Sequence, residues 1–293
     1  MAETHVAQVR RFNRVATERA GALSENFLGR RRPLGQARLL WEIGPGGEDV
    51  RTLRARLGLD SGYLSRLLRA LEADGLVTVR PGTEDGRVRR VTLSARGARE
   101  WDELESRSQA LATSVLEPLN ERQRSELAAA MQTVERLLTA SMIDISVEDP
   151  ATPDARWCLE QYYADLRERF DAGFDPSRSS VPDPDEMAPP TGLFLVARLR
   201  GEPAGCGGLL FHDADPPDIK RMWVAPAVRG LGLGRRILSE LEERARAAGA
   251  TAVRLDTNRN LTEAISMYRS SGYEEIPRYS DEHYAHHWFE KSL

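Results

Sequence analysis

A glycine-rich turn carries the clearest chemistry in this chain. It reads Arg229-Gly230-Leu231-Gly232-Leu233-Gly234-Arg235, an Arg-x-x-Gly-x-Gly pattern. Glycines lack a Cβ atom, so the backbone can curl tightly and expose consecutive N–H groups. At the start of a helix these N–H groups lie at the positive end of the helix dipole, which suits a pyrophosphate. The turn therefore predicts the binding site of a phosphorylated cofactor.

The segments on either side of the turn predict the elements that would position it. An apolar strand is expected over 219–224, and a helix over 233–248 with its apolar residues at helical spacing. A dinucleotide-binding fold would need Gly-x-Gly-x-x-Gly and a later acidic residue, and a P-loop would need Gly-Lys-Ser/Thr. Neither pattern is present, so another phosphate-binding fold is indicated.

Length and charge indicate two domains with different partners. The chain has 293 residues, enough for two domains. Residues 1–142 hold 23 Arg and no Lys against 19 acidic residues, whereas residues 143–293 hold 16 Arg and 2 Lys against 26. The first half is therefore basic and the second acidic. We place the domain boundary between residues 142 and 143, where an amphipathic helix over 120–142 ends.

The composition favours a cytoplasmic protein without a membrane segment. No apolar run approaches the length of a membrane span, and the N-terminal residues show no signal-peptide pattern. The two cysteines, Cys158 and Cys206, are far apart in sequence, which argues against a disulfide framework.

The first half shows the helix and strand order of a nucleic-acid-binding domain. Helices are expected over 4–27, 33–43, 50–57, 62–74 and 120–142, with a β-hairpin of strands 76–80 and 89–93. Asp60 or Ser61 can cap the fourth helix. Small and cationic side chains near the start of that helix suit a reader of the DNA major groove, and an arginine on the hairpin tip can enter a minor groove. The candidate DNA-binding residues are Ser61, Tyr63, Ser65, Arg66, Arg69 and Arg87.

This half resembles the MarR family of winged helix-turn-helix regulators. The resemblance covers about residues 6–142 and rests on the segment 64–72, on Gly75-Leu76-Val77, on the wing Asp85-x-Arg87 and on Leu93-Ser94-x-x-Gly97. It implies a mostly α-helical winged-helix domain that forms a homodimer through its first and last helices. The dimer is expected to bind double-stranded DNA.

The second half alternates strands and helices. Strands are expected near 143–147, 193–199, 204–212, 218–224, 252–256 and 284–291, with helices over 153–171, 233–248 and 262–271. The segment 174–190 is rich in Pro, Asp and Ser and is expected to be a long loop that is disordered or faces the substrate.

This half resembles the GNAT N-acetyltransferases over about residues 144–293. Three segments carry the resemblance: Arg221-Met222-Trp223-Val224-Ala225-Pro226, the turn Arg229-x-x-Gly232-x-Gly234, and Glu263-Ala264-Ile265-x-x-Tyr268-x-x-x-Gly272-Tyr273. It implies an α/β fold with a mixed central sheet and flanking helices, and acetyl-CoA as the cofactor. In that family the strand equivalent to 219–224 carries a bulge and parts from the strand at 252–256, and pantetheine fills the gap.

The resemblance also implies which residues hold the cofactor. Positions 222 and 224 match the strand contacts with pantetheine, and Asn260 lies near the usual cofactor-contacting asparagine. Asn258 or Leu261 could hold that place instead, because the spacing to Tyr268 is one residue longer than expected. The candidate cofactor-binding residues are Met222, Trp223, Val224, Arg229, Gly230, Leu231, Gly232, Leu233, Gly234, Arg235, Asn260 and Tyr268.

Three residues are candidates for catalysis. Tyr268 matches the residue that protonates the leaving thiolate, and a phenol near the sulfur is a plausible general acid. The general base is open between Asp218, which begins the central strand, and Glu160 on the preceding helix. No metal site is expected, because strand alternation separates His286 from His287.

The combined expectation is a transcriptional regulator that is also an acetyl-CoA-dependent N-acetyltransferase. Its acceptor would be a small-molecule or peptide amine that attacks the thioester directly. The acidic balance of the second half and its Asp-rich 175–186 segment favour a cationic acceptor. One alternative is a non-catalytic sensor of a ligand or of acetyl-CoA that controls DNA binding. Another is an enzyme whose first half only dimerises.

Overall fold

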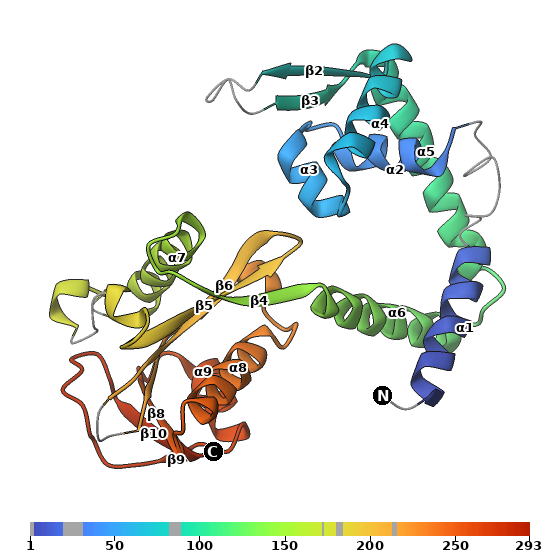
Figure 1. Cartoon of the computed structure of the whole chain (residues 1–293). Coiled ribbons are helices and arrows are strands. Elements are labelled where there is room, and N and C mark those ends of the chain that lie inside the picture. Colours follow the sequence, from blue (N-terminus) through green and yellow to red (C-terminus); the bar gives the residue numbers. More distant parts are fainter. Residues whose placement is uncertain (1–2, 20–31, 82–88, 172, 180–183, 213–215) are drawn as a thin grey trace. The chain divides into compact units, whose positions relative to one another are not determined.

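The chain divides into two compact units. The computed structural model describes residues 3–19, 32–81, 89–171, 173–179, 184–212 and 216–293 (Figure 1). One unit comprises Met1–Gln132 and the other Thr133–Leu293. The expected boundary after residue 142 lies between the end of a helix at Ser141 and the start of a strand at Ile143, and it stays a prediction.

The N-terminal unit is mostly helical with one small sheet. Its elements are α1 (Glu3–Arg19), α2 (Leu34–Ile43), β1 (Glu48–Asp49), α3 (Val50–Leu57), α4 (Ser61–Ala73), β2 (Val77–Pro81), β3 (Arg89–Leu93), α5 (Ala95–Leu116) and α6 (Glu121–Ser141), the last of which continues past the unit boundary. The strands form an antiparallel sheet in the order β1-β3-β2.

The stripe of leucines on α4 anchors the core of this unit. Leu64, Leu67, Leu68 and Leu71 are buried, since they recur at the spacing that places them on one helix face. Asp60 begins the helix, because its carboxylate accepts a hydrogen bond from the Tyr63 N–H at 2.8 Å. The strand β1 is not among the predicted elements, because two residues are too few to show a period. The end of the predicted helix 4–27 lies outside the described residues.

The C-terminal unit is built on a mixed seven-stranded sheet. Its elements are β4 (Ile143–Glu148), α7 (Pro153–Arg169), β5 (Gly192–Leu199), β6 (Glu202–Leu210), β7 (Asp218–Val224), α8 (Leu233–Ala247), β8 (Ala252–Thr257), α9 (Thr262–Ser270), β9 (Glu274–Glu275) and β10 (His287–Ser292). The strand order is β4-β5-β6-β7-β8-β10-β9. The β7 and β8 strands are parallel and the other neighbours antiparallel. The expected fold class is confirmed for both halves.

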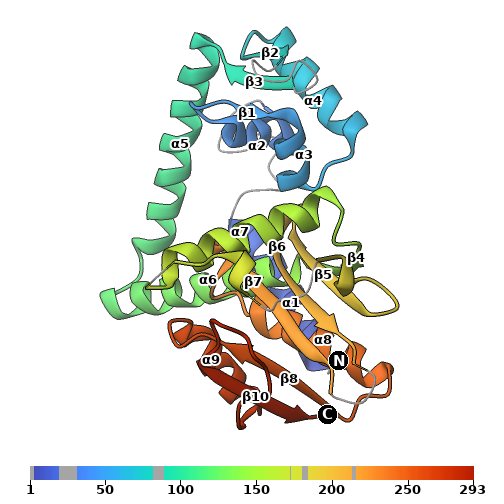
Figure 2. The same cartoon turned by 90° about the vertical axis from the view of Figure 1, so that its left-hand side faces the viewer.

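Helices cover both faces of this sheet (Figures 1 and 2). Successive side chains of β5 point to opposite faces, so Leu195 packs with α8 and α9 while Phe194 packs with α7. The described parts of the expected loop 174–190 contain two short 3₁₀ turns, Pro176–Arg178 and Pro184–Met187. Among the helices of the described residues, none is long and apolar enough to cross a membrane.

The close contact between α5 and the start of the hairpin predicts that Gly97 cannot be replaced without loss of stability. A Cβ on Gly97 would lie 1.9 Å from the Leu76 carbonyl oxygen, so Gly97→Ala must push backbone apart. Overpacking of this kind costs about 1–3 kcal/mol. We expect thermal unfolding followed by circular dichroism to show a lowered midpoint. The exposed neighbour Arg96→Ala is the control, and an equal loss in both variants would contradict the packing argument.

Candidate active site

The glycine-rich turn joins the end of β7 to the start of α8. A short 3₁₀ turn (Pro226–Val228) follows β7, after which Gly230 and Gly232 adopt φ values of +82° and +79°. Side chains other than glycine rarely adopt this region, so these positions require glycine. The Arg236 N–H bonds to the Gly232 carbonyl at 3.2 Å and closes the first helical turn. The N–H groups of 233–235 are therefore those that a helix leaves for an outside acceptor.

The turn is held against α7 by Arg229. Its guanidinium donates to both carboxylate oxygens of Asp165 at 3.1 and 3.0 Å, and its Nε donates to the Val224 carbonyl at 3.1 Å. Both bonds to Asp165 come from one guanidinium nitrogen, and together with the Nε bond they hold the turn to α7 and to the end of β7. Arg235, in the first turn of α8, donates a hydrogen bond to the Ser270 hydroxyl at 2.9 Å.

A β-bulge in β7 opens the sheet beside the turn. Cys206 pairs with Trp223 and Gly208 pairs with Lys220, so one residue of β6 faces two residues of β7. Arg221 takes a left-handed φ of +56° at this point. Along β8 the register contains a single pair with β7, Asp218 with Arg254. The edge of β7 beyond the bulge is thus turned away from β8, as the family resemblance implies.

A cavity of about 470 Å³ occupies this opening. Most of the predicted cofactor-binding residues line it: Met222, Trp223, Val224, Arg229, Gly230, Gly232, Leu233, Gly234, Arg235 and Tyr268. We call it the cofactor cavity. A Cβ built on Gly230 or Gly232 would meet no heavy atom of the described residues within 4 Å, so both glycines border open space. At Gly234 a Cβ would instead lie 3.1 Å from the Met267 sulfur, so this glycine also serves packing.

Leu231 and Asn260 lie outside the described lining of this cavity. Leu231 packs against the core. Asn260 donates its side-chain amide to the Arg169 carbonyl at 2.9 Å, and its N–H bonds to the Asn258 side chain at 2.9 Å. Of the two alternatives for its place, Leu261 lines the cofactor cavity, whereas Asn258 lines a second cavity beside it.

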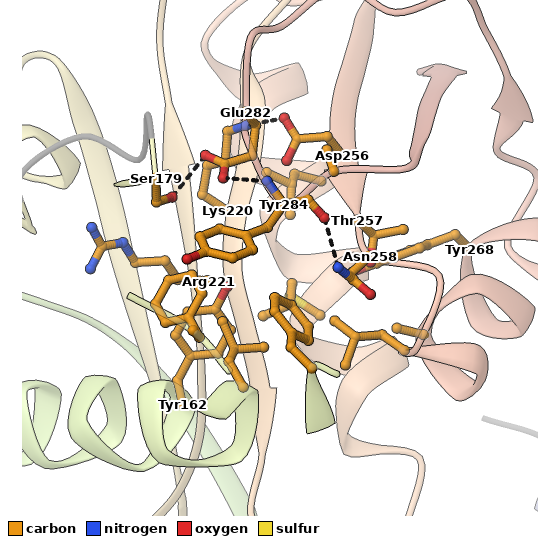
Figure 3. Close-up of a pocket in the computed structure, with 18 residues that line it drawn as sticks. Tyr162, Ser179, Lys220, Arg221, Asp256, Thr257, Asn258, Tyr268, Glu282 and Tyr284 are labelled. Atoms are coloured by element: carbon orange, nitrogen blue, oxygen red, sulfur yellow. Dashed lines mark hydrogen bonds and ion pairs between the residues drawn. The ribbon is translucent and has the colours of Figure 1, made fainter. Parts of the chain in front are cut away.

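The second cavity, of about 80 Å³, lies between α7, β7, the end of β8 and the segment before β10 (Figure 3). We call it the acceptor cavity. Its lining has residues in common with the cofactor cavity: Tyr162, Leu166, Met222, Leu261, Ala264 and Tyr268. The two cavities therefore meet at these side chains, one of which is the predicted proton donor.

Tyr268 is held protonated at this junction. Its side chain is 5% exposed and lies with its ring 5.8 Å from that of Tyr273. Burial raises the pKa of the Tyr268 phenol above its ordinary value, and the nearby Asp256 carboxylate raises it further. The phenol thus keeps its proton at neutral pH.

Charged side chains gather at one end of the acceptor cavity, as Figure 3 shows. Lys220 pairs with Asp256 at 2.7 Å, and Glu282 accepts a hydrogen bond from the Ser179 hydroxyl at 2.7 Å. Burial lowers the pKa of Lys220, but the Asp256 and Asp218 carboxylates outweigh that effect and hold the pKa above its ordinary value. Lys220 is therefore a fixed cation within a group of carboxylates.

Neither candidate base belongs to the lining of the acceptor cavity. Asp218 is buried, accepts a hydrogen bond from the Tyr279 hydroxyl at 2.8 Å and lies 3.6 Å from Lys220. Glu160 is exposed on α7. Their roles as a base stay predictions.

The histidine and cysteine side chains serve local contacts. His286 Nε2 lies 2.7 Å from the Arg259 guanidinium, and His287 pairs with Glu275 at 2.7 Å. The Cys206 thiol is buried and contacts the Arg221 carbonyl at 3.4 Å. Within the described ranges, no group of three or more His, Cys, Asp or Glu side chains is placed to hold a metal ion.

The predicted DNA-binding residues of α4 lie on the side away from its leucines. Ser61, Tyr63, Arg66 and Arg69 are exposed and Ser65 is half-buried. The Arg66 guanidinium lies 5.6 Å from the centre of the Tyr63 ring, a cation–π distance. Arg87, on the predicted wing tip, lies outside the described residues.

Sequence reasoning missed most of the acceptor cavity. Asp256 is the last residue of the predicted strand 252–256 and Asn258 follows it, so their position at its carboxyl end was an available signal. Glu282 and Tyr284 lie in an irregular segment with no period, so only the fold brings them to the cavity. Asp165 carries no signal either, because it is one of several charged residues on α7.

Comparisons with known proteins agree with both halves. Residues 159–273 match the model of the acetyltransferase (GNAT) family, and residues 31–88 match that of the MarR family. The chain is 34% identical over 116 residues to an IAA acetyltransferase of Azospirillum brasilense, a match that covers 39% of this chain and 71% of that protein. It is 28% identical over 142 residues to N-alpha-acetyltransferase RimI of Mycobacterium tuberculosis, covering 47% of this chain and 84% of that protein. A solved GNAT-family acetyltransferase of Staphylococcus aureus aligns with a TM-score of 0.45 and 18% identity, over 52% of this chain and 99% of that one.

The chain belongs to the GNAT acetyltransferase family and carries a MarR-family domain in its N-terminal half. It is an N-acetyltransferase, and its acyl donor is acetyl-CoA. Both resemblances expected from the sequence are confirmed.

Proposed function

We propose that this protein is both a DNA-binding regulator and an enzyme that transfers the acetyl group of acetyl-CoA to an amine. One observation carries the enzymatic part: the cofactor cavity and the acceptor cavity meet at Tyr268 and Met222. A donor in one cavity and an acceptor in the other would therefore face each other across a buried phenol.

The chain's own residues supply binding, orientation and a proton. Bound acetyl-CoA provides the acetyl group as a thioester. The N–H groups of 233–235 and the open space at Gly230 and Gly232 suit its pyrophosphate. The strand edge beyond the Arg221 bulge offers backbone groups to pantetheine, and the Val224 N–H can polarise a carbonyl there. Tyr268 holds a proton on Oη for the departing sulfur.

The cofactor site predicts that Gly232→Val weakens acetyl-CoA binding. Gly232 adopts φ +79° at the start of α8, so a β-branched side chain both strains the turn and projects into the space left for phosphate. Calorimetry should show at least about a tenfold loss of affinity, equal to about 1.4 kcal/mol.

Gly249→Val is the matched control for this prediction. Gly249 has φ +95° just beyond the C-terminal end of the same helix, with no described heavy atom within 4 Å of an added Cβ. It therefore introduces similar strain away from the cavity. Equal affinity in both variants would exclude Gly232 from the cofactor site.

The junction of the cavities predicts that Tyr268→Phe lowers turnover. The substitution keeps the ring and removes the proton donor, so kcat should fall by about 10²-fold while acetyl-CoA affinity stays unchanged. The control is Tyr273→Phe, whose ring packs against Tyr268 outside the described lining of either cavity. Weakened cofactor binding with preserved kcat would show that Tyr268 only packs against the cofactor.

The N-terminal unit supports DNA binding through α4. Arg66 and Arg69 are exposed on one face of α4, while the leucines of the opposite face are buried and anchor the helix in the core. A helix that reads a DNA groove needs this arrangement. Exposed apolar side chains on α1, among them Val9 and Val15, and on α6, among them Met131 and Leu137, support a homodimer.

The face of α4 predicts salt-dependent and sequence-dependent DNA binding. Affinity should fall as salt rises, because neutralised phosphates release counterions. Arg66→Ala should cost about 1–3 kcal/mol and relax the preference at particular bases. Fluorescence anisotropy with sequences selected from random DNA measures both effects, with the exposed α5 variant Arg99→Ala as the control for lost charge. Selection that enriches no motif at low salt would contradict a sequence-specific regulator.

A further inference from the structure

Two segments that are far apart in the sequence form the outer wall of the acceptor cavity. The Ser179 hydroxyl donates to Glu282, and the Asp175 N–H donates to the Tyr284 hydroxyl at 3.0 Å. The Phe174 ring lies 4.9 Å from that of Tyr284. These contacts tie the segment after α7 to the segment before β10. The wall therefore limits what can enter beside Tyr268.

The acceptor cavity is small. Its volume of about 80 Å³ is several times the 10–15 Å³ or so that one water needs, and well below the roughly 300–1,000 Å³ of an ordinary ligand pocket. This volume favours a compact molecule over an oligosaccharide or an extended peptide.

Aromatic rings form much of the wall. Tyr162, Phe170, Phe174 and Tyr284 all line the cavity, and the Phe170 and Tyr284 rings lie 5.6 Å apart. An apolar body gains by leaving water for such a surface. Ring faces also attract a cation, so the wall suits a molecule with an apolar body and one positive charge.

The charges at the far end favour a cation over an anion. Asp256 and Glu282 line the cavity, and the Asp218 carboxylate lies 3.6 Å from the Lys220 ammonium. Lys220 is therefore close to three carboxylates. The second cation of the lining, Arg221, bonds to the Tyr163 hydroxyl and stacks 5.4 Å from the centre of its ring. Lys220 is thus paired with carboxylates and Arg221 with a neutral hydroxyl, and an acceptor carboxylate at the Lys220 end would meet Asp256 and Glu282.

We propose that the acceptor is a small primary amine with an aryl or alkyl body, a single positive charge and no carboxylate beside the amine. The inference rests on the proposed acetyl transfer and names its substrate class. The apolar body packs against the wall of Phe174 and Tyr284, and the ammonium group approaches the end at Glu282 and Asp256. The small volume disfavours a peptide chain beside the amine, and the carboxylates at this end disfavour the carboxylate of a free amino acid.

A matched set of acceptors tests the proposal on the full chain. The acceptors are 2-phenylethylamine, phenylalanine and a tripeptide that begins with phenylalanine, which have the same ring and differ in the group on the carbon that bears the amine. Release of the CoA thiol is measured at saturating acetyl-CoA. We expect kcat/KM for 2-phenylethylamine to exceed that of the other two by at least about tenfold, a difference of about 1.4 kcal/mol. Equal or greater activity with the amino acid or the tripeptide would overturn the proposal.

Two variants test the residues of the wall. Glu282→Gln removes a buried charge and Phe174→Leu removes a ring, and each should raise KM for 2-phenylethylamine several-fold with acetyl-CoA affinity unchanged. Asp281→Asn is the matched control, because its carboxylate is adjacent in sequence and 99% exposed. Values of KM in both wall variants equal to that of the control would refute the assignment. Acetyl-CoA binding without transfer to any of the three amines or to a wider amine panel would instead refute the proposed function itself.

Discussion

The parting of β7 from β8 is the constraint on which both cavities depend. It begins at the bulge, where Arg221 adopts a left-handed φ of +56° and β7 holds one residue more than β6 opposite it. Such a conformation costs about 1–3 kcal/mol for a residue other than glycine. The surroundings offset this cost, since the Arg221 side chain bonds to Tyr163 and its carbonyl accepts from the Cys206 thiol. Among the described residues the register of β7 with β8 holds the single pair Asp218 with Arg254, and Met222, further along β7, lines both cavities.

Sequence reasoning reached the features that are local and stopped at those that are not. The α8 helix and the glycines before it follow from spacing within one segment, and Tyr268 follows from the family resemblance. The structure places these glycines and the tyrosine along one cavity. The asparagine is placed less well by the sequence, because a one-residue ambiguity in a turn cannot be resolved by period. In the structure the Asn258 side chain accepts a hydrogen bond from the Asn260 N–H, and the Asn260 side-chain amide donates to the Arg169 carbonyl. Which residue contacts the cofactor stays a prediction.

The surroundings of the predicted base, Asp218, could not be read from the sequence either, because they depend on a residue far along the chain. Asp218 is a candidate because it begins the central strand, and the strand does begin there. Its carboxylate is nevertheless engaged by Tyr279, which lies 61 residues further along the chain. No pattern near Asp218 could show that contact. The carboxylates that do line the acceptor cavity, Asp256 and Glu282, come from the end of β8 and from an irregular segment.

The acidic balance of the C-terminal half is a poorer guide to the acceptor than the position of a few carboxylates. Many acidic side chains of this half serve structural pairs: Glu148 and Asp154 hold Arg198, and Glu242 holds Lys291. In the Asp-rich 175–186 segment, Asp175 accepts hydrogen bonds from Ser177 within its own turn. Such charges are paired locally and carry little preference for a ligand. Selectivity for a cation arises where burial prevents screening, and in this unit that condition is met around Lys220, where the enclosed carboxylates outnumber the lysine.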